Sequence, residues 1–257
     1  DAPTREALGR PPAWTLADVE AALRAWRAAP RRPHYRVQVN VADFHGEVWR
    51  AGARALRFRV VVGTPGDHAT PTLASAIRHI VFNPYWNVPA RIFERELRPR
   101  GTEGLDEDAL AAALAVRGLE LVERGTPRAH VRQPPGPTNP LGRVKFLFPN
   151  PFDVYLHDSP QRGLFDDAFR AASHGCVRVH RPLELARLLL SHDGAGSPQD
   201  VDPWLARGTE EVVTLLQPVP VFIDSIRVRV DDRGVVQQLP DLYGLGFAFG
   251  RDLTQAP

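Results

Sequence analysis

The segment Ser173-His174-Gly175-Cys176-Val177-Arg178-Val179 brings a thiol, an imidazole and a glycine together in a few positions. Gly175 permits a positive φ and close approach of a substrate backbone. It also helps consecutive backbone N–H groups to converge on one point, as an oxyanion hole requires. A nucleophilic thiolate needs a lowered pKa, which a neighbouring imidazolium can supply. The segment therefore predicts a cysteine nucleophile.

A second imidazole lies upstream, in Val154-Tyr155-Leu156-His157-Asp158. The alternation of a strand places Tyr155 and His157 on one face and Val154 and Leu156 on the other. His157 precedes Cys176 by 176 − 157 = 19 positions, so the two must meet across a loop. We predict that His157 is the base that serves Cys176.

The same residues allow two other interpretations. A lone cysteine is more often a small buried hydrophobe than a nucleophile, and one cysteine cannot form an intramolecular disulfide. A zinc site from His157, His174, Cys176 and His180 is conceivable, but the chain has no second close cysteine pair. We therefore expect no metal and no cofactor.

The elements that must position these residues follow from periodicity. A helix is expected over residues 15–29, capped by Thr15, with Leu16, Val19, Leu23 and Trp26 on one face. Period-two alternation predicts strands at 35–41, 47–51, 56–62, 75–82, 143–148, 153–157, 212–216, 220–224, 226–230 and 235–239. Further helices are expected at 90–97, 106–116, 182–190 and 203–207.

This order of elements predicts a mainly β (α+β) fold. We divide the chain into an N-terminal extension with one helix, 1–33, and a catalytic domain, 34–257. The stretch at about 88–138 combines short helices with a stiff Pro-rich loop, and we interpret it as a small helical capping insertion.

Composition excludes several function classes. Hydrophobic residues make up 43% of the 257, which excludes a disordered chain. The net charge is only +2, and the basic residues, nearly all Arg, are scattered, so no nucleic-acid partner is expected. No apolar run reaches the roughly 18–20 residues that span a bilayer, so no transmembrane segment is expected. The chain begins Asp1-Ala2-Pro3, contains no Met and shows no export signal, which we interpret as a processed form.

Several ordered motifs between about residues 20 and 245 resemble the L,D-transpeptidase (YkuD-type) catalytic domain family, in particular its larger, envelope-spanning branch. Beyond His157 and the segment around Cys176, the motifs are Val60-Val61-Val62-Gly63, Thr70-Pro71, Asn83-Pro84-Tyr85-Trp86-Asn87-Val88-Pro89, Asn139-Pro140-Leu141-Gly142 and Lys145-Phe146.

The resemblance implies a β-sandwich-like domain with a cap over the cleft, and a covalent two-step reaction. The thiolate attacks the carbonyl of the L-centre of the diamino acid in a peptidoglycan tetrapeptide stem, and D-alanine leaves. An amine of a second stem then resolves the thioester acyl-enzyme and forms a 3→3 cross-link. Carbapenem β-lactams are implied as covalent inhibitors.

The resemblance also implies residue roles. Cys176 is the nucleophile, and His157 acts as base and later as acid. The carbonyl of Asp158 orients the His157 ring, and N–H groups near Gly175 and Cys176 bind the oxyanion. Substrate contacts are expected from Tyr155, Ser173, His174, Arg178 and Trp86. His174 and Arg178 could equally brace the loop, and Trp86 could be packing.

Two alternatives remain open. One is a hydrolase, an L,D-carboxypeptidase that passes the same thioester to water. The other is a cell-wall-binding module without activity, against which the intact Cys176 and His157 argue. The implied location is the periplasm or cell envelope, and the implied role is in peptidoglycan biosynthesis and cell shape.

Overall fold

The computed structural model describes residues 16–29, 31–230, 233–245 and 249. The helices are α2 (Leu16–Ala28), α3 (Ala90–Ile92), α4 (Glu107–Ala115), α5 (Pro182–Asp193) and α6 (Val201–Arg207), with short 3-10 or π turns η1 (Val41–Asp43), η2 (Phe93–Leu97), η3 (Arg162–Phe165) and η4 (Pro198–Asp200). The strands are β1 (Arg36–Asn40), β2 (His45–Arg50), β3 (Ala53–Gly63), β4 (Leu73–Phe82), β5 (Trp86–Asn87), β6 (Glu120–Val122), β7 (His130–Gln133), β8 (Val144–Leu147), β9 (Leu156–His157), β10 (Ala171–Ser173), β11 (Val177–Val179), β12 (Glu211–Asp224), β13 (Val228–Val230) and β14 (Val236–Gln238). The fold is mainly β with small helices, which confirms the expected fold class.

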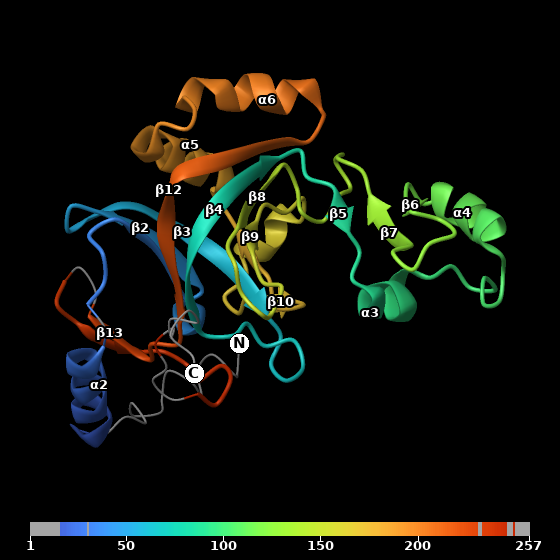
Figure 1. Ribbon diagram of the computed structural model, residues 1–257. Helices are drawn as coiled ribbons and strands as arrows, with labels where there is room; N and C mark the ends of the chain where they lie inside the picture. The colour runs from blue at the N-terminus through green and yellow to red at the C-terminus, as the bar shows by residue number, and fades with distance from the viewer. Residues whose placement is uncertain (1–15, 30, 231–232, 246–248, 250–257) are drawn as a thin grey trace.

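The main sheet closes on itself. Its order is β10-β3-β11-β9-β8-β4-β12-β1-β2, and β2 pairs again with β3 (Figure 1). Residues alternate along the strands, so that Val37 and Val39 of β1 are fully buried while Arg36, Gln38 and Asn40 face outward. The sandwich-like arrangement expected from the sequence therefore takes the form of one closed sheet around a single apolar core.

Helices α5 and α6 cover one end of this sheet (Figure 1). Pro182 stands in the first turn of α5, where its missing N–H costs nothing, and Gly194 ends the helix at φ 76°. The buried Leu185 and Leu189 join the core. Among the described residues, no helix is both long and apolar enough to span a membrane.

Strand β12 is one long strand, where the sequence predicted two. Its register against β4 shifts between Thr214 and Val219, a stretch that contains Pro218. Proline cannot donate to a sheet ladder and favours bulges. The carboxylate of Asp193, at the end of α5, accepts hydrogen bonds from the N–H groups of Leu216 (2.8 Å) and Gln217 (2.5 Å) in this bulge. The bulge is therefore satisfied from a helix, and the strand continues through it.

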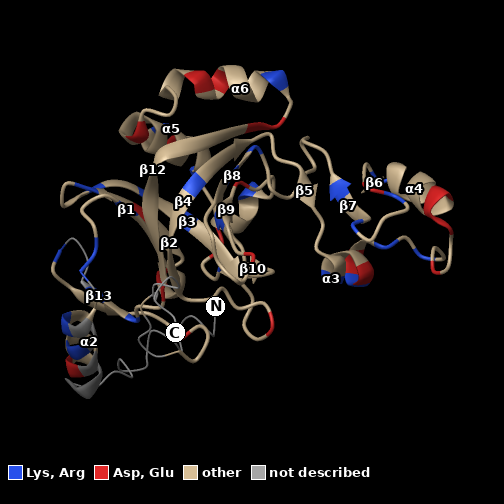
Figure 2. Cartoon of the chain, in the orientation of Figure 1, with Lys and Arg blue, Asp and Glu red and all other residues tan. Residues whose placement is uncertain are grey.

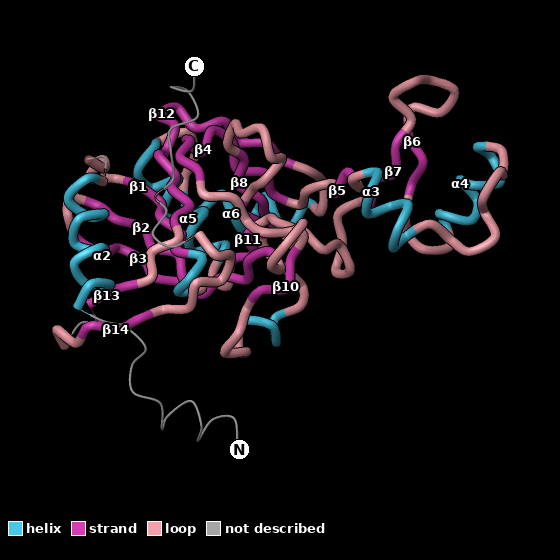
Figure 3. The backbone as a smooth tube through the Cα atoms, turned by 90° about the horizontal axis from the view of Figure 1, so that it is seen from below, coloured by secondary structure: helices cyan, strands magenta, loops and turns pink. Residues whose placement is uncertain are grey.

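A separate lobe lies between β4 and β8, which are neighbours in the sheet, and projects to one side in both views (Figures 1 and 3). It holds α3, η2, α4 and a three-stranded sheet of order β5-β7-β6. Its own small core contains Val88, Phe93, Leu114, Leu119 and Val131. The lobe lies where the insertion was predicted, but it contains strands as well as helices. These strands were not predicted, because segments of two to four residues are too short to show a period-two alternation.

Asparagine side chains fix both ends of this lobe. Asn83, at φ 46°, donates to the carbonyls of Trp204 (3.0 Å) and Thr209 (3.1 Å). The fully buried Asn139 donates to the carbonyl of Pro84 at 3.0 Å and accepts from the N–H of Leu141 at 2.9 Å. The exit of the lobe is thus tied to its entry, and the entry is tied to α6 and the turn after it.

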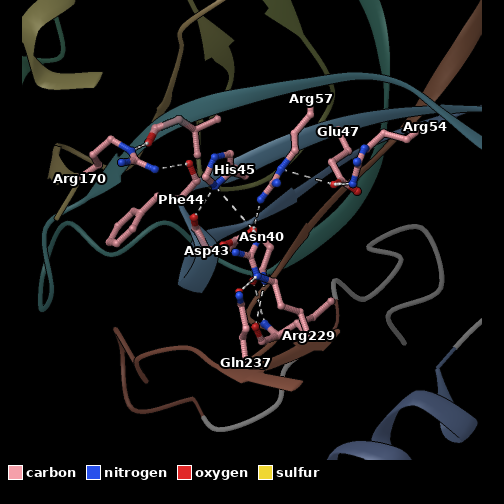
Figure 4. Close-up of polar contacts among 12 residues, drawn as sticks. Asn40, Asp43, Phe44, His45, Glu47, Arg54, Arg57, Arg170, Arg229 and Gln237 are labelled. Atoms are coloured by element: carbon pink, nitrogen blue, oxygen red, sulfur yellow. Dashed lines mark hydrogen bonds and ion pairs between the residues drawn. The ribbon is translucent and has the colours of Figure 1, made fainter. Parts of the chain in front are cut away.

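Helix α2 and the β13–β14 hairpin lie over the outer face of β1 and β2 (Figures 1 and 3). Asp43 accepts hydrogen bonds there from Arg57 (3.1 Å) and Arg229 (2.6 Å), so that an ion-pair cluster holds the hairpin to the sheet (Figure 4). The expected apolar face of α2 is only partly packed: Leu23 and Trp26 are about half exposed. The proposed cap Thr15 lies outside the described residues.

Charged residues of both signs are spread over the sheet and the lobe (Figure 2).

Candidate active site

Neighbouring parallel strands carry the two residues predicted to do chemistry. In β9 and β11, Val177 lies opposite Leu156, and Arg178 lies opposite His157. Leu156 and Val177 are buried in the core, so alternation turns His157 and Arg178 to the other face of the sheet. Cys176, one position before β11, continues this alternation.

Hydrogen bonds hold the loop from Ser173 to Cys176 in shape. The Ser173 hydroxyl donates to the carbonyl of Cys176 at 2.6 Å and accepts from the Gly175 N–H at 3.2 Å. Gly175 has φ +113°, a conformation that other residues rarely adopt. The buried Thr70 hydroxyl donates to the Gly175 carbonyl and accepts from the Gly63 N–H, both at 2.8 Å. This loop, which carries the predicted nucleophile and is called the nucleophile loop below, is thus braced from within and from the neighbouring loop.

This bracing changes two predicted roles. Because the N–H of Gly175 already has a partner, it is not a free oxyanion donor in this conformation. The N–H of Cys176 has no partner among the hydrogen bonds of the described residues, so it is a donor that this loop leaves available. Ser173 is buried with its hydroxyl engaged in the loop, so it does not present that group to a substrate.

The Cys176 thiol is a protonated group in this environment. The side chain is partly exposed, and its Sγ–H donates to the carbonyl oxygen of Asp153 at 3.7 Å. Asp153 adopts φ 53°, the left-handed region. Burial raises the pKa of Cys176 to about 11, although hydrogen bonds with Tyr155 favour the thiolate.

The His157 ring is a neutral base with a fixed tautomer. Nδ1 lies 2.5 Å from the carbonyl oxygen of Asp158. A carbonyl can only accept, so Nδ1 carries the proton and Nε2 has a free lone pair. Burial lowers the pKa of His157 to about 3, and the positive charges of Arg178 and Lys145 lower it further.

Cys176 and His157 are therefore a neutral thiol and a neutral imidazole at rest. An imidazolium that would lower the thiol pKa is not present in this conformation, because burial disfavours both charged forms. Among the hydrogen bonds of the described residues, none joins Sγ to the His157 ring. Proton transfer would require the thiol to turn away from the Asp153 carbonyl.

Asp158 contributes its two ends differently. Its carbonyl holds the His157 ring, while its buried carboxylate accepts from the Arg143 N–H at 2.9 Å and from Arg162 at 3.0 Å. A Cβ on Gly142 would lie 2.4 Å from that carboxylate, so only glycine fits there. The carboxylate therefore stabilises the position of Asp158, and the carbonyl of the same residue orients the His157 ring.

Tyr155 and Arg178 flank the thiol and the imidazole. Burial, followed by the charge of Cys176, raises the pKa of Tyr155, so its hydroxyl stays protonated. The Tyr155 ring lies edge-on to His157, with centroids 5.7 Å apart. Arg178 donates to the side-chain oxygen of Gln161 at 2.8 Å and forms no ion pair with any described carboxylate. Its cation thus remains available to an anionic group.

His174 points away from the pair and toward the lobe. It is exposed, its Nε2 lies 2.8 Å from Oε1 of Glu96 in η2, and its ring lies edge-on to His68 at 4.7 Å. A second contact, from Arg91 to Asp67 at 3.0 Å, joins the same edge of the lobe to the loop before β4. His174 therefore connects the nucleophile loop to the lobe.

Trp86 is not brought to Cys176. It lies in β5 and packs against the small core of the lobe. Of the nine predicted site residues, the structure gathers Tyr155, His157, Asp158, Ser173, Gly175, Cys176 and Arg178 around the two strands, places His174 at the lobe contact and places Trp86 in the lobe.

Sequence reasoning gave no site role to Asp153, Thr70, Glu96 or Lys145. Asp153 acts through its backbone carbonyl, which leaves no pattern in the sequence. Thr70 belongs to one of the motifs named above, but its bond to the Gly175 carbonyl depends on the fold. Within the described residues, no three His, Cys, Asp or Glu side chains are grouped so that they could hold a metal ion.

Comparison with known proteins places this site in a family. The family model described as the L,D-transpeptidase catalytic domain matches residues 34–221, which include every residue of the site. This chain belongs to the L,D-transpeptidase catalytic domain family. A curated Haemophilus influenzae protein, named provisionally as an L,D-transpeptidase, is 32% identical over 222 residues, covering 82% of this chain and 44% of its own length. The chain thus spans less than half of that relative.

Solved structures of L,D-transpeptidases are also similar. The Enterococcus faecium catalytic domain acylated by ertapenem is 11% identical, with 76% of this chain and 99% of that chain covered and a TM-score of 0.35. Mycobacterium tuberculosis L,D-transpeptidase 3 with a faropenem-derived adduct is 11% identical, with 74% and 60% covered and a TM-score of 0.35. Membership of the family rests on the family model and the curated relative.

Proposed function

We propose that this L,D-transpeptidase-family chain is an active peptidoglycan L,D-transpeptidase with Cys176 as nucleophile and His157 as base. The observation that carries the proposal is a lone thiol immediately before β11, next to the strand β9, which carries a neutral imidazole with its Nδ1 engaged and its Nε2 unprotonated. A general base needs that free lone pair at working pH.

In the first half-reaction, the Cys176 Sγ–H turns from the Asp153 carbonyl and gives its proton to Nε2 of His157. Sγ forms a bond to the carbonyl carbon of the diamino acid in a tetrapeptide stem, and the oxyanion takes the Cys176 N–H. One such donor typically lowers the activation barrier by about 3 kcal/mol. The C–N bond then breaks, and the nitrogen of D-alanine leaves with the proton from His157.

In the second half-reaction, the amine of a second stem attacks the thioester, and His157 takes the proton of that amine. The C–S bond breaks, Sγ recovers a proton, and a 3→3 cross-link has formed. Water in place of the amine would give the hydrolase alternative. The lobe contact at His174 favours the transferase, because a lobe tied to the nucleophile loop can order an acceptor.

The remaining proposals follow from this activity. Donor and acceptor stems are the partners, carbapenems acylate Cys176, and the site of action is the periplasm or cell envelope, in wall synthesis and cell shape. We propose residues 1–33 as an extension and 34–257 as the catalytic domain, with the insertion at about 88–138 as its cap.

Product analysis tests the choice of acceptor. A purified tetrapeptide stem is incubated with the protein, with and without an excess of acceptor stem, and the products are separated by mass spectrometry. The proposal predicts a cross-linked dimer and free D-alanine. Tripeptide and D-alanine alone, at every acceptor concentration, would establish the hydrolase. If neither product forms, only the interpretation as a binding module without activity remains.

A further inference from the structure

Lys145 is the only lysine of the chain, in which the other 31 of 32 basic residues are arginine. At solvated positions the two residues serve alike, but an ammonium is a compact point charge whereas a guanidinium is a wide planar fork. The one lysine is half-buried on β8, next to the candidate active site.

The strand register places this lysine beside the base. Lys145 lies opposite His157 in the antiparallel β8–β9 pair, and Arg178 lies opposite His157 on the other side, in β11. Directly opposed residues of neighbouring strands share a face of the sheet, with Cβ atoms typically about 5 Å apart. The neighbours Val144 and Phe146 are buried in the core, so Lys145 faces the same side as His157. A cation therefore stands on each side of the imidazole.

Neither cation is neutralised within the described part of the chain. The Lys145 ammonium donates to the carbonyl of Tyr85 at 3.2 Å, and Arg178 donates to the Gln161 amide at 2.8 Å. The charge of Glu210 reaches Lys145, but that carboxylate accepts from the Tyr85 N–H instead of pairing with the lysine. Burial lowers the pKa of both Lys145 and Arg178, because it disfavours their charged forms.

The proposed reaction supplies an anion at this place. His157 returns its proton to the nitrogen of the leaving D-alanine, so this nitrogen must approach Nε2. The terminal carboxylate is separated from that nitrogen by a single carbon atom. It must therefore come to lie among the residues that flank His157.

We propose that Lys145, together with Arg178, binds the terminal carboxylate of the donor stem and so selects stems that end one residue after the diamino acid. The assignment rests on the proposed function. It makes Lys145 a specificity-determining residue, since a stem with a further residue would put an amide where the cations require a carboxylate.

The lone lysine permits a direct test without turnover. Reductive methylation with ¹³C-formaldehyde labels only Lys145 and the α-amino group and keeps their charges. In Cys176→Ala protein, saturation with a free-acid tetrapeptide stem should raise the pKa of the Lys145 methyl signal by about one unit, because a nearby anion favours the ammonium. The same stem ending in D-alaninamide, which keeps all its other carboxylates, should leave it in place. Equal shifts with both stems, or none, would overturn the assignment.

Kinetics of Cys176 acylation provide the second arm. Native protein should prefer the free acid over the amide by about tenfold to a hundredfold in kcat/KM, as expected for a charged hydrogen bond. Lys145→Met should abolish most of this preference, and Lys145→Arg should restore part of it. A Lys145→Met variant that slows both stems equally would assign the lysine to His157 and not to the carboxylate.

Carbapenem adduct formation separates the two proposals. If native Cys176 forms the adduct but the Lys145 methyl signal does not respond to the terminal carboxylate of the stem, only the Lys145 assignment is overturned. No adduct removes the proposed function, and the lysine titration still decides whether a carboxylate binds.

Discussion

The carbonyl oxygen of Asp158 accepts the Nδ1 proton of its neighbour His157 at 2.5 Å. Because the acceptor is a backbone atom that does not titrate, Nε2 is the unprotonated nitrogen of the neutral ring. Together with the lowered pKa of His157 and the raised pKa of Cys176, this contact predicts a resting state in which the imidazole is a neutral base and the thiol is protonated.

The pH dependence of thiol alkylation should reveal the resting state. With a Cys176 pKa of about 11, the thiolate fraction rises about tenfold for each pH unit between 7 and 9. Alkylation by iodoacetamide, a small neutral reagent, should rise in proportion. The rate is measured by mass spectrometry, with free cysteine as the reference. A rate that is already constant from pH 6 upward would indicate a thiolate–imidazolium pair.

Acid stability should depend on His157. A His with a folded pKa of about 3, below its ordinary 6.5, stays neutral in the native state but binds a proton when unfolded. Its contribution is therefore complete above pH 6.5 and is lost as pH falls toward 3. By linkage this loss amounts to about 3 kcal/mol at pH 4.

Urea unfolding of native and His157→Gln protein at pH 7 and pH 4 tests this. The variant should be less sensitive to the change in pH than native protein. If both lose the same free energy of unfolding between the two pH values, the imidazole is not held neutral by the fold.

Gly175→Ala should damage the nucleophile loop through its backbone. At φ +113° an L residue is strained by about 1–3 kcal/mol, whereas the nearest atom to an added Cβ, the His68 carbonyl oxygen, is 3.8 Å away. We expect slower acylation of Cys176 with a lowered free energy of unfolding. Gly163→Ala, at an open position without positive φ, is the matched control. Full activity of Gly175→Ala would show that the loop does not need this conformation.

Glu96→Gln should affect the reaction more than the stability. The Glu96–His174 pair is about half exposed, and exposed pairs typically contribute 0–1 kcal/mol. If the pair positions the lobe, acceptor transfer should slow severalfold while iodoacetamide alkylation of Cys176 is unchanged. Glu94→Gln, which breaks the neighbouring exposed pair with Arg98, serves as control. Equal transfer rates in the two variants would remove the coupling.

The sequence predicted those parts of the structure that depend on alternation. Val154 and Leu156 are buried on one face of their strand, as the predicted alternation requires, which puts His157 on the opposite face. The strand at Val177–Val179, which does the same for Arg178, was not predicted. The closure of the sheet was not predictable, because it depends on pairings between strands far apart in the sequence, such as β1 with β12 and β3 with β11. The two-residue strand β5 was too short to recognise.

The site could be predicted by residue type but not by electrostatics. Cysteine, histidine and glycine can be recognised in the sequence by their type and spacing. Burial, which sets the pKa values of Cys176 and His157, is a property of the fold. The partner of His174 was equally out of reach, because Glu96 comes from 78 positions earlier in the chain. Trp86 was named as a candidate cleft residue only because it stands in a motif that resembles the family.

Intact-protein mass spectrometry of Cys176 tests the account most directly. Native protein and Cys176→Ala are each incubated with a carbapenem and, separately, with a tetrapeptide stem. The account predicts a covalent adduct on native protein alone, with release of D-alanine from the stem. Folded native protein that forms no adduct and releases no D-alanine, or an adduct that persists in Cys176→Ala, would contradict it.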